Sequence, residues 1–181
     1  HRVASGPPPP YKGPVAADGA FLHTGPAPPK KLFRQTEEPM ANITETYLGN
    51  RRVECVHTLS GTKLYTTPTP DHGGSGESFS PTDLCAAALG ACAMSVLATY
   101  AENHGLDVSG TRLEIAKTMT AGSPSRIGRL EVLFHMPARP YSAKEKTVME
   151  RAAKTCGVHH SLHPAVEQVF TFDWPEAAPQ A

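Results

Sequence analysis

The 181-residue chain predicts an α+β fold in the order βββ-α-ββ-αα-β. One observation behind this prediction is that β-branched and aromatic residues alternate in short runs, typical of strands, which form separate groups along the chain. The other is a strongly apolar segment with helical capping signals between the first two groups. Because strands cluster around helices instead of alternating strictly with them, the pattern favours α+β over a doubly wound parallel sheet.

Residues 1–39 differ in composition from the rest of the chain. Nine of the 18 prolines lie there, with few large apolar residues and no hydrophobic period. We expect a disordered, Pro-rich leader, which lacks the apolar core of a secretory signal. Our hypothesis is that Met40 is the natural start and that the leader is vector-derived or an upstream extension; a natural Pro-rich linker is the alternative.

Residues 40–181 then form the predicted domain, which is long enough to bury a core. They carry twelve basic and fourteen acidic side chains, so the formal charge is −2. Without a basic field, the composition argues against nucleic-acid binding. No run of about 18 apolar residues predicts a membrane span. Without an export signal, we expect a cytoplasmic protein whose four cysteines are reduced.

The first predicted strands form a β-meander. Alternating segments separated by glycine-containing turns indicate three strands, over residues 42–48, 51–59 and 63–67. A loop rich in Pro, Gly and Ser follows at 68–78.

A central helix is the strongest local prediction. Ser80 is a typical N-cap, a proline follows at the first helical position, and Asp83 completes a capping box. Residues 84–98 contain a single polar side chain, and a helix that is apolar all round must be buried on all sides. We expect this helix to run to about Asn103 as the core of the domain.

The second half of the domain predicts a hairpin, two helices and a last strand. Residues 108–120 and 127–136 alternate as hairpin strands. A capping box at Ser142 begins a helix that would carry Cys156 at its buried face or C-terminal end, with Gly157 ending it. The remaining elements are a short helix and a strand, at residues 161–166 and 168–173.

Cysteine spacing leaves the role of Cys92 open. In the apolar helix, Cys92 can be simply a small buried hydrophobic residue. Cys85 lies two turns earlier on the same face, roughly 10 Å away, which is too far for a disulfide. A redox partner would therefore come from elsewhere, and Cys156 is the available candidate. Cys55, within a predicted strand, is interpreted as a packing residue.

Two motifs in the chain resemble those of the OsmC/Ohr family, the osmotically inducible and organic hydroperoxide resistance proteins. Residues 80–84 (SPTDL) and 86–92 (AAALGAC) resemble the central-helix signature of the family. Residues 156–158 (CGV) with 161–164 (SLHP) resemble its second signature. The expected element order also matches that family over most of residues 42–174.

This resemblance implies a function and an assembly. Family members are thiol peroxidases that reduce organic hydroperoxides or hydrogen peroxide, and they form obligate, intertwined homodimers with two active sites at the subunit interface. By resemblance, Cys92 matches the peroxidatic cysteine and Cys156 the resolving cysteine. An external dithiol, such as a lipoyl protein, would reduce the resulting disulfide, so no metal or organic cofactor is expected.

The same resemblance implies a cation near the reactive thiol, because a buried thiolate needs compensation. Family members use an arginine from the N-terminal strands, held by a glutamate at the start of the central helix. Here Thr82 stands at the glutamate position, so Asp83 or Glu77 is the candidate acid, although Asp83 also reads as a capping acid. Arg51 is the best candidate for the arginine, with Arg52 beside it; solvated surface is the alternative for both.

Two other function classes remain open from the residues. The domain could be a small-ligand-binding or redox-sensing protein without significant peroxidase turnover. His159, His160 and His163 near Cys156 could bind a metal such as zinc, although surface or interface histidines are the simpler interpretation.

Overall fold

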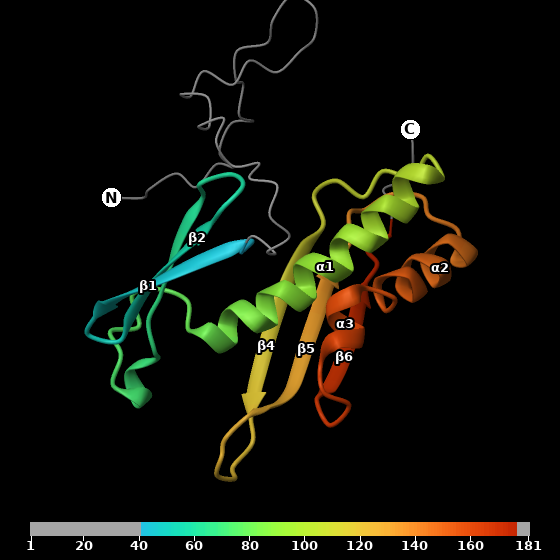
Figure 1. Ribbon diagram of the computed structural model, residues 1–181. Helices are drawn as coiled ribbons and strands as arrows, with labels where there is room; N and C mark the ends of the chain where they lie inside the picture. The colour runs from blue at the N-terminus through green and yellow to red at the C-terminus, as the bar shows by residue number, and fades with distance from the viewer. Residues whose placement is uncertain (1–40, 177–181) are drawn as a thin grey trace, which may run out of the picture. The chain divides into compact units, whose positions relative to one another are not determined.

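The computed structural model describes residues 41–176, so the predicted leader at 1–39 lies outside the described residues. Within this part the chain is α+β, as predicted, with two three-stranded sheets (Figure 1). Its elements are β1 (Ile43–Gly49), β2 (Arg52–His57), β3 (Lys63–Thr66), the short 3-10 helix η1 (Pro70–His72), α1 (Pro81–Asn103), β4 (Arg112–Met119), β5 (Ile127–His135), α2 (Ala143–Ala153), α3 (Gly157–Ser161) and β6 (Glu167–Asp173).

The first sheet is the predicted meander, with strand order β1-β2-β3 and antiparallel pairing throughout. Its first turn places Gly49, Asn50 and Arg51 at φ values of 85°, 50° and 60°. Such left-handed conformations end the extended strand, and Gly and Asn adopt them most easily. Strand β2 therefore begins at Arg52, and Arg51 belongs to the turn instead of the strand.

The second sheet has the order β4-β5-β6, with β4–β5 antiparallel and β5–β6 parallel. A parallel pair needs a crossover connection, and α2 and α3 provide it. Alternate residues of β5, namely Leu130, Val132 and Phe134, are buried in the core. Phe134 stacks on Phe172 of β6 at 4.5 Å between ring centroids.

Helix α1 lies across the second sheet and contacts β4, β5, α2 and α3 (Figure 1). Its capping box is present as predicted: the Ser80 side chain accepts from the backbone of Asp83, and the Asp83 side chain accepts from the backbone of Ser80. Gly90 allows β4 to approach closely, because a Cβ there would lie 2.5 Å from Cδ1 of Ile115. By length and composition α1 would also pass as a membrane span. Leu89, Ala93 and Leu97 are fully buried on one face, whereas 33% of its apolar window is buried, so the expected burial on all sides is not reached within this chain.

The connection after α2 differs from the prediction. Helix α2 ends at Ala153, and the short helix is α3 at Gly157–Ser161, so the predicted helix at 161–166 is wrong. Gly157 begins this helix instead of ending α2. The sulfur of Cys156 acts as its N-cap, which no standard capping pattern predicts. The helix ends at its C-cap, Leu162, whose backbone is extended at φ −71° and ψ 147°. The proline at position 164 also disfavours helix at the residue before it.

Candidate functional site

The structure brings Cys92 and Cys156 close together, although 63 residues separate them in the sequence. Cys92 lies in the middle of α1, and Cys156 lies between α2 and α3. The two thiols are near enough for each to shift the pKa of the other. Cys156 is fully buried and Cys92 is half-buried, and both are free thiols. The pair joins α1 to the crossover connection at one point of the core.

The surroundings of the two thiols shift their pKa values in opposite directions. The backbone N–H of Val158 lowers the pKa of Cys92 below the ordinary 9.0, with further lowering by the Cys156 thiol and the N–H of Gly157, against the opposing effect of burial. Burial raises the pKa of Cys156; the N–H of His159 offsets this in part, and the Cys92 sulfur raises it further. Cys92 is therefore the thiol that ionises first, and the Cys156 thiol beside it favours this ionisation.

This arrangement has a chemical consequence. The thiolate is the nucleophilic form of cysteine, so the lowered pKa favours Cys92 as the attacking sulfur. Cys156 stays protonated beside it, in position for a later thiol–disulfide step. Cys85 lies earlier on α1 and Cys55 lies in β2, where its thiol donates to Glu45 Oε1 at 3.4 Å, and burial raises the pKa of Cys55.

Asp83 is held at the start of α1 by a lysine. Its carboxylate is 2.6 Å from Nζ of Lys117 on β4, and the Ser80 hydroxyl donates to it at 2.6 Å. Lys117 and then Ser80 lower the pKa of Asp83 to about 2. Lys117 also donates to the hydroxyl of Thr82 at 2.6 Å, the position where the resemblance leads one to expect a glutamate.

Sequence reasoning missed Lys117, although a signal was present. In β4 the odd-numbered positions carry the apolar residues Leu113 and Ile115, which contact α1. By period-2 alternation Lys117 falls on this same inner face. A charged residue at an inward position needs a partner, and Asp83 provides it.

The two adjacent arginines have different partners. Arg51 donates through one guanidinium nitrogen to the carbonyls of His72 and Gly73, at 2.9 and 2.8 Å. These bonds anchor the η1 loop to the β1–β2 turn. Arg52 forms an ion pair with Glu77 at 3.3 Å and lies over the ring of Tyr65, 4.4 Å from its centroid. Of the two, Arg52 has the carboxylate partner.

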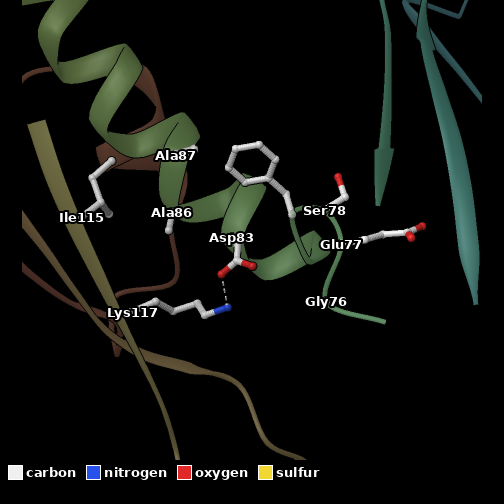
Figure 2. Close-up of a pocket in the computed structure, with 9 residues that line it drawn as sticks. Gly76, Glu77, Ser78, Asp83, Ala86, Ala87, Ile115 and Lys117 are labelled. Carbon is white, nitrogen blue, oxygen red and sulfur yellow. Dashed lines mark hydrogen bonds and ion pairs between the residues drawn. The ribbon is translucent and has the colours of Figure 1, made fainter. Parts of the chain in front are cut away.

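A cavity of about 700 Å³ lies beside the first turns of α1 (Figure 2). Cys92 is not among the residues that line it. Its apolar side is made by the loop before α1, by α1 and by β4, and the Asp83–Lys117 pair forms a polar end. The lining residues are Gly76, Glu77, Ser78, Phe79, Asp83, Ala86, Ala87, Ile115 and Lys117.

The histidines near Cys156 have ordinary partners. Nδ1 of His159 is 2.8 Å from the side-chain oxygen of Gln168, and Nδ1 of His163 accepts from the N–H of Ala165. The ring of His160 lies edge-on to that of His159. Within residues 41–176 no group of three or more His, Cys, Asp or Glu side chains is arranged to hold a metal ion.

These observations define an α+β protein whose central helix carries one member of a close pair of free thiols. The family model for OsmC-like proteins matches residues 74–169, which include both Cys92 and Cys156, and the chain belongs to this family. No curated protein matches the chain.

Solved structures support the fold. A protein from Psychrobacter arcticus, described as an osmotic stress induced and detoxification response protein, is 29% identical with a TM-score of 0.72, covering 75% of this chain and 98% of its own. The organic hydroperoxide resistance protein OsmC from Legionella pneumophila is 16% identical, with a TM-score of 0.60 and coverage of 75% and 99%. An organic hydroperoxide resistance protein from Elizabethkingia anophelis is also 16% identical, with a TM-score of 0.59 and coverage of 76% and 99%. At this identity the last two show the fold alone.

Proposed function

We propose that this protein is a thiol-dependent peroxidase that reduces organic hydroperoxides or hydrogen peroxide in oxidative or osmotic stress defence. The observation that carries the proposal is the proximity of Cys92, whose pKa is lowered, to Cys156, whose pKa is raised. Membership of the OsmC-like family agrees with it. So do the names of the similar Legionella and Elizabethkingia proteins, which refer to hydroperoxide resistance.

The proposed reaction uses the two sulfurs in sequence. The Cys92 thiolate attacks one oxygen of the hydroperoxide, the O–O bond breaks, and the departing alkoxide takes a proton and leaves as an alcohol. Cys92 is then a sulfenic acid. The Cys156 sulfur attacks it, a disulfide forms, and the sulfenic oxygen leaves as water with the proton from Cys156.

An external dithiol completes the proposed cycle. Its thiolate attacks the Cys92–Cys156 disulfide, its second thiol displaces the mixed disulfide, and both protein thiols are restored while the dithiol becomes oxidised. A lipoyl protein is the reductant that the family resemblance implies. We propose that no metal or organic cofactor takes part, and that the protein works in the cytoplasm, where thiols are kept reduced.

We also propose a homodimer with its two sites at the subunit interface. Apolar side chains on the first sheet are exposed, with Ile43 at 57%, Tyr47 at 67% and Leu48 at 51%. Ile43 and Tyr47, four residues apart in β1, share one face of the strand, and exposed apolar side chains on one face mark an interaction surface. Arg52, held by Glu77, is the cation that we propose to assist Cys92 at this interface, because the guanidinium of Arg51 is already committed to the η1 loop. Sedimentation equilibrium tests the dimer, and a monomer at micromolar concentration would contradict it.

The peroxidase proposal is tested by consumption of cumene hydroperoxide with dihydrolipoamide as reductant. The variant Cys92→Ser is expected to lose turnover, whereas Cys156→Ser, assayed without reductant, is expected to consume about one equivalent and then stop. Cys85→Ser is the matched control on the same helix and should turn over like the unaltered protein. If Cys92→Ser consumes hydroperoxide at the unaltered rate, or if the unaltered protein consumes none, the proposal fails.

A binding function is the second candidate, because the 700 Å³ cavity has an apolar wall and excludes Cys92. It would hold a small, mainly apolar ligand next to the Asp83–Lys117 pair. Native mass spectrometry of the purified protein would detect a retained ligand. The variant Ile115→Trp would fill the cavity. Ligand binding that is kept in Cys92→Ser and lost in Ile115→Trp supports this candidate. Equal spectra from the two variants argue against it.

A further inference from the structure

Gln168 on β6 holds α3 through two hydrogen bonds to a single residue. Its side-chain nitrogen donates to the backbone carbonyl of His159 at 3.1 Å. Its side-chain oxygen is 2.8 Å from Nδ1 of the same histidine. Because the amide nitrogen is the donor in the first bond, the oxygen is the acceptor in the second, so Nδ1 carries the hydrogen. One amide therefore fixes both the main chain and the ring of His159.

Helix α3 depends on such contacts. It has five residues, and a helix this short is not stable by itself in water. The N–H of His159 donates to the sulfur of Cys156 at 3.3 Å, and the His159 ring packs edge-on against Phe170 of β6 at 5.5 Å. The clamp by Gln168 thus ties the first turn of α3 to a strand of the second sheet.

This first turn also faces the reactive pair. The N–H of His159 donates to the sulfur of Cys156, and the N–H groups of Gly157 and Val158 are near enough to Cys92 to lower its pKa. Hydrogen bonds to a sulfur stabilise its ionised form only if the donors stay in place. The position of these three donors is set by α3, and the position of α3 is set in turn by its contacts with β6.

We propose that Gln168 is a positioning residue, which acts through His159 to keep the backbone N–H groups of α3 directed at the two cysteine sulfurs. This inference rests on the proposed function, since it concerns the same thiol pair. It assigns to β6, an element that carries neither cysteine, a part in tuning their reactivity through His159. Gln168 itself contacts neither sulfur in the described hydrogen bonds.

The experiment measures thiol ionisation, which does not require peroxidase turnover. The full chain is pulsed with iodoacetamide between pH 5 and pH 10, and alkylation of the Cys92 peptide is read by mass spectrometry. The variant Gln168→Met keeps the side-chain length but loses both hydrogen bonds. We expect its Cys92 alkylation rate at pH 7 to fall by about three- to tenfold, with the midpoint of the pH profile moved upward.

Two further variants separate positioning from general stability. His159→Phe keeps a ring against Phe170 but loses only the Nδ1 bond, so it should show a smaller shift in the same direction. Thr171→Val, at an exposed position on the opposite face of β6, is the matched control and should leave the profile unchanged. In the double variant Gln168→Met/His159→Phe, the effect should not exceed that of Gln168→Met, because both remove one clamp.

An unchanged midpoint in folded Gln168→Met overturns the inference. If that variant does not fold, an unchanged midpoint in His159→Phe does so instead. A lower melting temperature with an unaltered alkylation profile would show a structural role only, and also counts against it. If the midpoint shifts but the unaltered protein consumes no hydroperoxide, the positioning role stands and the proposed peroxidase function fails.

Discussion

The guanidinium of Arg52 lies 3.3 Å from the carboxylate of Glu77 and 4.4 Å above the ring of Tyr65. These contacts link β2, β3 and the loop before α1. The neighbouring Arg51, at the turn, bonds to two loop carbonyls instead. Adjacent residues of the same type thus have separate tasks, because the left-handed turn directs them to different partners.

We predict that Arg52→Ala slows hydroperoxide consumption by about tenfold or more, because the proposed cation beside Cys92 is lost. Both members of the Arg52–Glu77 pair are well exposed, so the pair adds little to stability and the melting temperature should change little. Arg51→Ala is the matched control, expected to retain activity within about threefold while loosening the η1 loop. Steady-state kinetics and thermal unfolding check both. Equal losses of activity in the two variants would contradict the assignment to Arg52.

The Asp83–Lys117 pair predicts how stability responds to acid. The pKa of Asp83 is about 2 in the folded protein, below its ordinary 3.8, so the stabilisation is full above pH 4 and is lost as the pH falls towards 2. Because the Asp83 side chain is more than a third exposed, we expect this stabilisation to be about 1 kcal/mol. In urea unfolding, Asp83→Asn should lower the free energy of unfolding at pH 6 and should lower it less at pH 2. An equal decrease at both pH values would count against the pair.

The close approach of β4 limits the size of the side chain that position 90 of α1 can accept. In Gly90→Ala the new methyl group would meet the flexible end of Ile115, which is 37% exposed and can move. The better helix propensity of alanine offsets this, so the free energy of unfolding should change by less than about 1 kcal/mol. In Gly90→Val the side chain is too large for Ile115 to make room, so the free energy of unfolding should fall by about 2 kcal/mol or more. Denaturant unfolding of both variants is the check, and equal values would show that the approach is not tight.

Local signals predicted the fold well, and long-range contacts were the part that they could not predict. The capping boxes at Ser80 and Ser142 involve residues three apart, and both helices begin where these patterns indicate. The helix at 157–161 was missed because a cysteine sulfur caps it and Gln168 holds it from another element. The proximity of Cys92 to Cys156 depends on packing across the core. No periodicity could have shown it.

The separation in sequence of the two neighbouring cysteines has a thermodynamic consequence. A disulfide between Cys92 and Cys156 would close a loop of roughly 60 residues in the unfolded chain, and this reduces its conformational entropy by an amount worth about 4 kcal/mol. The oxidised protein should therefore melt at a higher temperature than the reduced protein, and thermal denaturation would report the oxidation state directly. The Cys156→Ser variant should melt at the same temperature with and without oxidant. Each catalytic cycle would therefore pass through the disulfide form, which is the form of the protein most resistant to unfolding.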